Sequence, residues 1–234
     1  MKVLIGGKGK MGSLIVSTAE AQGHDVLGCA DVFDLSALEA GEADVVIDFS
    51  HRDNLSWIKD YVTAHHCALV YGTTGITEED HAVLNDLSTQ VPVFYSSNFS
   101  YGVAVMRKLL ETAVPLLEGS FDMELSETHH NQKKDAPSGT AKALLAIMNQ
   151  RGEYREVYGR EGITGARGKE IGVHSLRGGT EAGEHTVYFF GDNETITITH
   201  HAQNRQIFVN GAVRAAEFAV TQSAGMYDMN DLLF

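Results

Sequence analysis

A glycine-rich turn near the start of the chain constrains the fold more than any other feature. The turn, Gly7-Lys8-Gly9-Lys10-Met11-Gly12, fits the pattern G-x-G-x-x-G, follows an apolar run at residues 2–6 and precedes helix-like apolar spacing at residues 13–22. Strand, turn and helix in this order are typical of a dinucleotide-binding fold, because the glycines let the backbone approach a pyrophosphate and the helix N-terminus offers it unpaired N–H groups. The alternative is a glycine-rich turn that binds nothing.

Charged residues near this turn bear on the choice of nucleotide. Asp31 ends the apolar run at residues 25–30, nineteen residues after Gly12, where an acid would accept a hydrogen bond from a ribose 2′-hydroxyl. Its charge favours NADH because it repels a 2′-phosphate, whereas Lys8 and Lys10 attract one. The opposed charges predict that both NADH and NADPH are used. A surface aspartate without a ligand is the alternative interpretation.

Strands and helices alternate over the first hundred residues, which favours a parallel, doubly wound, Rossmann-like sheet. The predicted strands are residues 2–6, 25–30, 44–49, 68–71 and 91–96, and the predicted helices are residues 13–22, 54–65 and 78–88. Residues 32–43 have room for about two helical turns at most. The turn Gly72-Thr73-Thr74-Gly75 follows the fourth strand, at the edge where a nicotinamide ring lies in such sheets, unless it is simply a tight turn.

The pattern changes after residue 98, where an α+β domain with an open, mixed sheet is expected. Its predicted elements are helices at residues 101–117 and from 138 to about 150, and strands at residues 121–127, 171–179, 185–191, 194–202 and 206–211. Residues 151–170 predict a long exposed loop, because they hold charges and glycines without apolar periodicity. A helix at 210–222 and the tail at 225–234 are expected to return to the first domain. The predicted domains are residues 1–98, completed by 210–234, and residues 99–209.

The overall composition excludes some classes of function. The formal net charge of −13 argues against non-specific binding to nucleic acid or to anionic membranes, which needs a basic surface. No apolar run approaches the ~18 residues of a membrane helix, and no leader-like segment opens the chain. Cys29 and Cys67 lie in apolar runs, so we expect buried, reduced thiols. A cytoplasmic location is predicted.

A basic segment stands out against this acidic chain. His129, His130, Lys133 and Lys134 fall within six residues that contain no acid. The following segment, Pro137-Ser138-Gly139-Thr140, is predicted to start a helix whose unpaired N–H groups can bind a carboxylate. An imidazolium can both attract a dianion and deliver a proton near pH 7. We therefore predict a site for a small dicarboxylate.

A pair of adjacent histidines can also be two polar residues at the protein surface or two ligands of a metal ion. The pair His65-His66 is not part of a cluster of basic residues, and we interpret it as two polar residues at the surface. For His129-His130 no metal is expected, since adjacent histidines in an extended segment point apart and no Cys, His or carboxylate spacing supports a metal site.

The run from Glu127 to Ala141, E-x-H-H-x-x-K-x-D-A-P-S-G-T-A, resembles the signature of the 4-hydroxy-tetrahydrodipicolinate reductase family, formerly called dihydrodipicolinate reductases. Further matches cover essentially the whole chain. They are the nucleotide turn, Asp48-Phe49-Ser50, Gly72-Thr73-Thr74-Gly75, Asn98-Phe99-Ser100, Arg177-Gly178-Gly179, Gly183-Glu184-His185, His201-Ala202-x-x-Arg205 and Gly211-Ala212.

The resemblance implies reduction of 4-hydroxy-tetrahydrodipicolinate by hydride transfer from NADH or NADPH, in the diaminopimelate route of lysine biosynthesis. It implies that His129 donates the proton and that Lys133 is a second catalytic residue. The residues implied to bind the substrate are His130, Ser138, Gly139, Thr140 and Arg205, of which Arg205 closes over the site. The residues implied to contact the cofactor are Gly6, Gly7, Lys8, Gly9, Lys10, Met11, Gly12, Asp31, Gly72, Thr73, Thr74, Ser96, Ser97, Asn98 and Phe99.

The resemblance also implies a homotetramer assembled through the second domain, and a hinge between the two domains. The segment between Asp31 and Asp44 is shorter than in many members of the family, and Ser96-Ser97 replaces small apolar residues. Both departures concern the cofactor more than the reaction. Two alternatives are an amino-acid dehydrogenase with the same first domain, and an NAD-binding regulator without catalysis.

Overall fold

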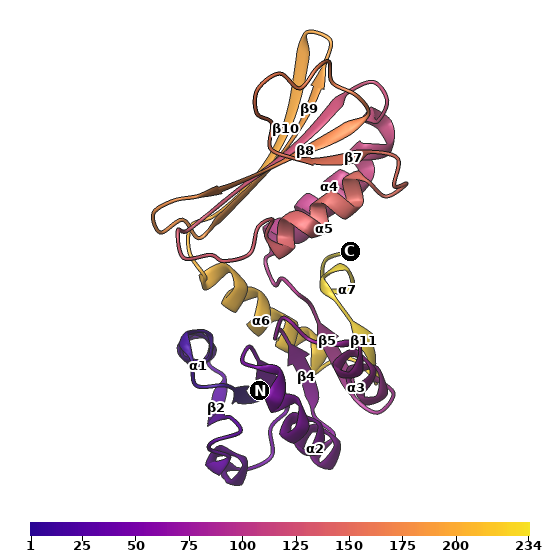
Figure 1. The fold of residues 1–234 in the computed structure, drawn as a ribbon. Coiled ribbons are helices and arrows are strands. Elements are labelled where there is room, and N and C mark those ends of the chain that lie inside the picture. The colour runs from indigo at the N-terminus through magenta and orange to yellow at the C-terminus, as the bar shows by residue number, and fades with distance from the viewer. The chain divides into compact units, whose positions relative to one another are not determined.

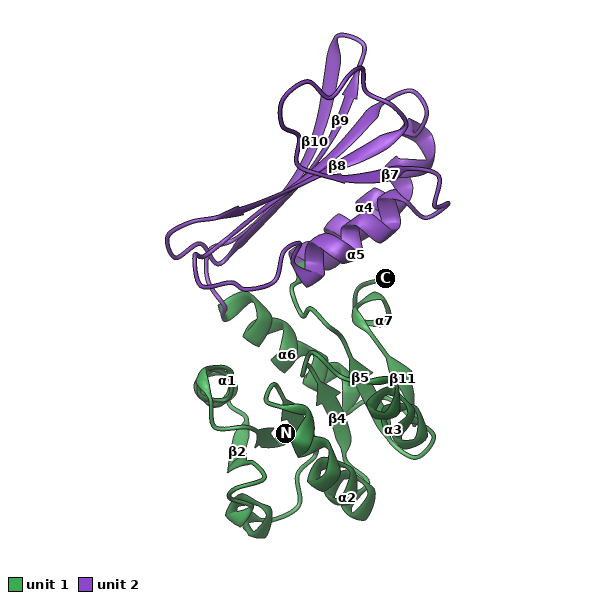
Figure 2. Cartoon of the chain, in the orientation of Figure 1, with its two compact units in different colours: residues 1–101, 206–234 green, residues 102–205 purple.

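The structure is a computed structural model that describes residues 1–234, and Figure 1 shows its ribbon. The chain divides into two compact units, shown in green and purple in Figure 2. Unit 1 comprises residues 1–101 and 206–234, and unit 2 comprises residues 102–205. Unit 1 thus extends beyond the predicted residue 98 and resumes before the predicted residue 210.

Unit 1 holds a six-stranded sheet in which every neighbouring pair is parallel. Its order is β11-β5-β4-β3-β1-β2. The strands are β1 (Lys2–Gly6), β2 (Asp25–Ala30), β3 (Val45–Asp48), β4 (Ala68–Tyr71), β5 (Pro92–Tyr95) and β11 (Gly225–Tyr227). Strand order reverses at β1, which pairs with β3 on one side and β2 on the other. In such sheets a ligand binds beyond the carboxyl ends of the strands at this switch point.

Helices cover both faces of this sheet, as its apolar strands require. The helices of unit 1 are α1 (Lys10–Ala21), α2 (Leu55–His65), α3 (Glu78–Ser88), α6 (Gln206–Ala219) and α7 (Met229–Leu233), with short 3-10 helices η1 (Ser36–Ala40) and η2 (Arg52–Asn54). Helices α2 and α3 pack with one set of strand side chains in a buried core around Trp57, while α6 contacts β3, β4 and β5. The predicted doubly wound fold is confirmed.

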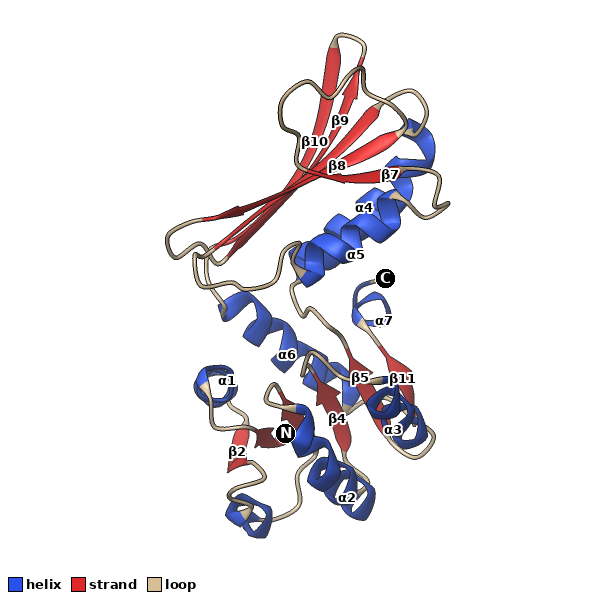
Figure 3. Ribbon diagram, in the orientation of Figure 1, coloured by secondary structure: helices blue, strands red, loops and turns tan.

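Unit 2 contains a mixed five-stranded sheet in the order β10-β9-β6-β8-β7. Its elements are α4 (Tyr101–Leu117), β6 (Asp122–His129), α5 (Gly139–Met148), β7 (Arg155–Tyr158), β8 (Glu170–Arg177), β9 (Gly183–Gly191) and β10 (Glu194–Ala202). Strands β6, β7 and β8 are parallel, and β9 is antiparallel to β6 and β10. Figure 3 shows α4 and α5 along one face of this sheet, where their apolar side chains build its core.

Two elements differ from the sequence-based expectation. The predicted strand at residues 206–211 is wrong, because these residues form the start of α6. The apolar side chains continue at helical spacing through Val209, Val213 and Ala216, all fully buried, and this periodicity outweighs the strand-like run Ile207-Phe208-Val209. The predicted loop at residues 151–170 contains β7, an edge strand that pairs with β8.

One smaller difference concerns the burial of Cys29. Cys67 is buried as expected, whereas Cys29 is half-buried, and both are free thiols. None of the helices combines the length and the apolar character that a membrane span requires.

Candidate active site

The candidate site forms where three strands of unit 2 change from apolar to polar on the face that α4 and α5 cover. Along β6, Met123 and Leu125 are buried in the core, and the same side of the strand then presents Glu127 and His129. The pairing of β6 with β9 places His185 opposite Glu127, and the pairing with β8 places Arg177 opposite His129. The parallel and antiparallel registers therefore bring four titratable residues to one end of the sheet.

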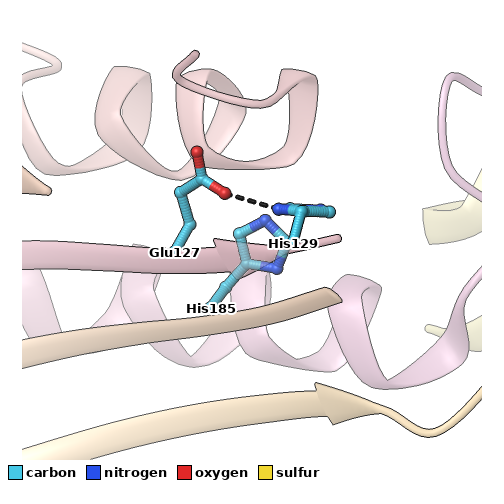
Figure 4. Close-up of side chains that lie close together, drawn as sticks. All are labelled: Glu127, His129 and His185. Atoms are coloured by element: carbon cyan, nitrogen blue, oxygen red, sulfur yellow. Dashed lines mark hydrogen bonds and ion pairs between the residues drawn. The ribbon is translucent and has the colours of Figure 1, made fainter. Parts of the chain in front are cut away.

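Glu127 is the centre of this cluster. Its carboxylate accepts a hydrogen bond from Nδ1 of His129 at 2.5 Å, as Figure 4 shows, and two from the guanidinium of Arg177, at 2.8 and 3.0 Å. The backbone N–H of Ser138 donates to it at 3.3 Å. Burial opposes ionisation of Glu127, which is 1% exposed, but the hydrogen bonds from Arg177, Ser175 and His129 outweigh burial and hold its pKa below the usual range. The carboxylate is therefore charged at neutral pH.

This arrangement determines which nitrogen of His129 can react. Nδ1 is bound to Glu127, whereas Nε2 has no hydrogen-bond partner in the structure. A Cβ atom on Gly183 would lie 3.0 Å from Nε2, so the glycine keeps the space beside this nitrogen open. Burial lowers the pKa of His129, Glu127 raises it, and Lys133 and Arg177 lower it further, so that the net shift is downward. An anion bound beside Nε2 would favour the protonated ring.

The ring of His185 packs edge-to-face against the ring of His129, with ring centroids 5.2 Å apart. Its Nε2 contacts the hydroxyl of Ser138 at 2.9 Å, and its buried Nδ1 has no partner. Burial, followed by the charge of His129, lowers the pKa of His185 to about 4. His185 is therefore neutral under ordinary conditions.

The segment between β6 and α5 holds the other predicted substrate residues. Lys133 forms an ion pair with Asp135 at 2.8 Å, and Arg177 donates to the carbonyl of Asp135 at 2.7 Å. Helix α5 begins at Gly139, and the Ser138 hydroxyl caps it by accepting from the N–H of Ala141 at 3.1 Å. The hydroxyl and N–H of Ser138 thus already have partners, and Gly139 and Thr140 form the first turn of α5, where carboxylate binding is predicted.

Two predicted substrate residues, His130 and Arg205, lie outside this hydrogen-bonded cluster. His130 is half-buried directly after β6. Arg205 is exposed in the turn between β10 and α6, and it forms no ion pair. The structure therefore joins His129 and Ser138 through Glu127, to which both donate, and Gly139 follows Ser138 in the chain, whereas Lys133 is bonded to Asp135.

The cluster also offers a conceivable metal site. Ligand atoms of Glu127, His129 and His185 lie within 4.8 Å of one another. However, both carboxylate oxygens already accept hydrogen bonds from Arg177, and a cation would have to displace this guanidinium. The expected absence of a metal stays a prediction.

The predicted cofactor turn lies at the carboxyl ends of β1 and β3, at the switch point of unit 1. Gly7 has a φ of +89°, and a Cβ atom there would lie 2.5 Å from Cβ of Ser50. A Cβ atom on Gly12 would lie 2.2 Å from the carbonyl oxygen of Gly7. Helix α1 begins at Lys10 without a side-chain cap, so the first N–H groups remain available to a phosphate.

The remaining predicted cofactor residues differ in what they can contact. Asp31 accepts hydrogen bonds from the N–H groups of Phe33 and Asp34 through one carboxylate oxygen, and Lys8 pairs with Asp34 at 2.5 Å. Thr73 is buried, whereas Thr74 and Ser97 are exposed. The Phe99 ring packs against the rings of Phe49 and Phe94, and it is therefore a core side chain rather than a free ligand contact.

Fold and site together define an oxidoreductase with a dinucleotide-binding sheet and a separate substrate-binding unit. Two family models match, the N-terminal part of dihydrodipicolinate reductase at residues 1–99 and its C-terminal part at residues 102–233. The chain therefore belongs to the dihydrodipicolinate reductase family, whose reaction is the NAD(P)H-dependent reduction of 4-hydroxy-tetrahydrodipicolinate in lysine biosynthesis.

Individual relatives agree with this assignment. The chain is 42% identical to the 4-hydroxy-tetrahydrodipicolinate reductase of Staphylococcus haemolyticus, over 99% of this chain and 100% of the relative. It is also 42% identical to the enzyme of the same name from Brachyspira hyodysenteriae, over 100% of both chains. The resemblance inferred from the motifs is confirmed.

Solved structures support the fold. A dipicolinate-bound dihydrodipicolinate reductase from Paenisporosarcina sp. TG-14 superposes with a TM-score of 0.77 at 24% identity, covering 100% of this chain and 99% of that one. A diaminopimelate dehydrogenase from C. glutamicum has a TM-score of 0.55 at 14% identity, covering 100% of this chain and 95% of that one.

Proposed function

We propose that this chain reduces 4-hydroxy-tetrahydrodipicolinate to tetrahydrodipicolinate with a hydride from NADH or NADPH and a proton from Nε2 of His129. The observation that carries the proposal is the hydrogen-bonded chain Arg177–Glu127–His129. Its charged carboxylate favours protonation of the ring, and Nε2 is directed away from Glu127 into the space that Gly183 leaves open. The ring hydroxyl leaves with a proton as water, which gives an unsaturated ring; the hydride then goes to the ring carbon that carried the hydroxyl and the proton from His129 to its neighbour.

The substrate carboxylates are assigned to positive groups around this proton donor. His130, the amides of Gly139 and Thr140 at the start of α5, and Arg205 are proposed to bind them, with Ser138 holding the helix start in place. Lys133 is proposed to stabilise negative charge that develops on the substrate and to contribute to protonation. Its present partner, Asp135, would release it to a bound dianion.

Unit 1 is proposed to bind the nucleotide through the glycine turn, Asp31, the Gly72–Thr74 turn and the Ser96–Phe99 segment. Lys8 is paired with Asp34, so its attraction for a 2′-phosphate is largely offset, while Asp31 still repels one. We therefore expect both nucleotides to be used, with NADH preferred.

A homotetramer assembled through the sheet of unit 2 is part of the proposal. The sheet face opposite α4 and α5 carries stacked rings of Tyr188 and Phe190, 5.6 Å apart, of which Phe190 is 44% exposed. On the same face Arg160 and Arg167 bind Glu124. Exposed aromatic and arginine side chains are typical of subunit interfaces. Sedimentation velocity would test this: a tetramer is expected, and a monomer at micromolar concentration would contradict it.

The experiment that tests the reaction is an assay of NADH and NADPH oxidation with freshly generated 4-hydroxy-tetrahydrodipicolinate. The wild-type chain should oxidise either nucleotide only when this substrate is present. His129→Gln and Lys133→Ala should each lower kcat by roughly 10²-fold or more, as expected for lost proton transfer, with nucleotide affinity unchanged. Near-normal kcat in both variants would refute the residue roles, and no substrate-dependent oxidation by the wild type would refute the reaction.

A further inference from the structure

A buried polar network in unit 1 lies beside the proposed cofactor segments, and none of its central residues has been assigned a role above. Asp48, at the end of β3, is fully buried, and Asn54, at the end of η2, is 3% exposed. Ser50 links them, because its hydroxyl donates to Asp48 and accepts from the side-chain amide of Asn54 at 2.6 Å. The three side chains therefore form one continuous hydrogen-bonded path.

Two ends of this path reach segments that are proposed to contact the nucleotide. Thr73, in the Gly72–Thr74 turn, donates to Asp48 at 2.5 Å and accepts from the N–H of Ser50 at 2.9 Å. At the other end, Oδ1 of Asn54 accepts from the N–H of Val32, the residue after Asp31, at 2.9 Å. The path thus connects the turn assigned to the nicotinamide with the loop assigned to the adenosine ribose.

The glycine turn rests directly on the middle of the path. A Cβ atom on Gly6 would lie 2.2 Å from Oδ1 of Asp48, and one on Gly7 would lie 2.5 Å from Cβ of Ser50. The absence of side chains at both glycines lets the phosphate-binding turn approach the network this closely. Three of the four proposed nucleotide segments, all except Ser96–Phe99, therefore share one support.

The network is costly to maintain, which argues that it does more than fill space. Burial raises the pKa of Asp48 to about 6 in spite of the hydrogen bonds from Ser50 and Thr73, so its charged form is held at a cost in stability. Apolar residues of similar size would fill the same volume without this cost. Polar groups kept at such positions commonly serve a functional geometry.

We propose that Asp48, Ser50 and Asn54 are positioning residues that hold the glycine turn, the Gly72–Thr74 turn and the Asp31 loop in one arrangement before the cofactor binds. A loop that is already ordered loses less conformational freedom on binding, and this raises affinity without adding a contact to the ligand. The inference rests on the proposed function, because it takes the three segments to be the nucleotide site. Asn54 is its sharpest test, since the bond from the N–H of Val32 ties it to the Asp31 loop, whereas its other partners, Ser50 and Trp57, lie outside that loop.

The experiment compares four variants of the full-length chain by calorimetric titration with NADH and with ADP-ribose, together with steady-state kinetics. Asn54→Ala and Ser50→Ala break the path. Asp31→Ala removes a proposed direct contact, and Asn85→Ala, on the exposed side of α3, is the matched control. Thermal unfolding of each variant sets a temperature at which all of them are folded.

Asn54→Ala removes the bonds from Val32 and Trp57 and the bond to Ser50, and Ser50→Ala removes the bonds to Asp48 and from Asn54. Each variant should weaken both ligands roughly tenfold and raise the KM for NADH by a similar factor, because only the ordering of the nucleotide segments enters the binding free energy. Their kcat at saturating NADH should stay within about threefold of wild type, because the His129 cluster is untouched. Asn85→Ala should bind like the wild type.

Separate outcomes distinguish failure of this inference from failure of the proposed function. If Asp31→Ala binds weakly while Asn54→Ala and Ser50→Ala bind within twofold of wild type, the positioning role is refuted and the nucleotide site stands. If the two variants lose kcat as strongly as they lose affinity, general destabilisation explains both losses, and the positioning role is refuted. If the wild type binds neither NADH nor NADPH, the proposed function itself fails.

Discussion

Glu127 is the residue whose chemistry depends most on its neighbours. Without Arg177 its burial would favour the neutral acid, and a neutral acid would not stabilise an imidazolium at His129. The pair Arg177–Glu127 is thus comparable in role to the acid that orients the histidine in hydrolase triads, although the reaction is different.

Glu127→Gln should remove this support while keeping the shape of the side chain. Because Glu127 raises the pKa of His129, its loss should lower that pKa further, and less of the reactive imidazolium should be present at neutral pH. We expect kcat to fall about 10- to 100-fold and the alkaline limb of the kcat profile to move to lower pH. Glu194→Gln, at an exposed position at the start of β10, is the control. An unchanged pH profile in Glu127→Gln would count against the role of this carboxylate.

His185 makes the stability of the chain depend on pH. Its pKa is about 4 in the folded chain and near 6.5 in the unfolded chain, so the unfolded chain binds more protons between these values. The unfolding free energy should therefore fall as the pH falls from about 6.5 to about 4, by roughly 3 kcal/mol in total from this group.

His185→Gln removes the titrating group, and urea unfolding followed by circular dichroism at pH 7 and pH 4.5 checks the effect. The wild type should lose more unfolding free energy between the two pH values than the variant does. Equal losses in both proteins would show that His185 is not the responsible group.

The sequence predicted only part of this residue-level arrangement. His129 and Lys133 stand out locally, because their charge contrasts with an acidic chain. Arg177 and His185 do not, because they meet Glu127 only through the pairing of β6 with β8 and β9, about fifty residues further along the chain. One signal was available: the core-facing positions of β6 change from Met123 and Leu125 to Glu127 and His129, and a buried acid needs a cationic partner.

At the level of elements, α6 shows where local pattern and tertiary context disagree. The strand prediction for its first residues relied on three successive residues with high β propensity, and no neighbouring strand was known to pair with them. The buried face of the whole helix, with seven small or branched residues inside unit 1, decides the outcome. Those residues are Val209, Gly211, Ala212, Val213, Ala215, Ala216 and Ala219.

Gly211 allows α6 to pack this closely. A Cβ atom there would lie 1.8 Å from the carbonyl oxygen of Phe99, which is backbone and cannot rotate away. Alanine gains about 1 kcal/mol in helix propensity, but the clash should cost more, and we expect Gly211→Ala to lower the unfolding free energy by at least about 2 kcal/mol. Urea unfolding followed by the fluorescence of Trp57, the only tryptophan, checks this in unit 1. Asn210→Ala, on the exposed side of α6, should leave the unfolding free energy nearly unchanged. If Gly211→Ala is as stable as the wild type, α6 can shift away from Phe99, and the close packing is not required.

At the level of the whole molecule, the alternation of strands and helices predicted the doubly wound sheet, and its change after residue 98 predicted a second unit. The sequence did not reveal the tail strand β11, because three residues carry too little periodicity, and only its pairing with β5 identifies it.

The two units should respond differently to the nucleotide. NADH at a hundred times its Kd should stabilise the unit that binds it by about 2.7 kcal/mol. Since Trp57 lies in unit 1, we expect the urea midpoint measured by its fluorescence to rise when NADH is added. An unchanged midpoint at saturating NADH would contradict the assignment of nucleotide binding to unit 1.

The division of unit 1 into two chain segments has a consequence for synthesis on the ribosome. Strand β5 is made before residue 101, but its neighbour β11 and the covering helix α6 follow only after residue 205. At 5–20 residues per second, translation of the intervening hundred or so residues takes about 5–20 s. During this time the nascent sheet has an unprotected edge and a bare apolar face, so the cell's chaperones have their main opportunity to bind there before the chain is finished.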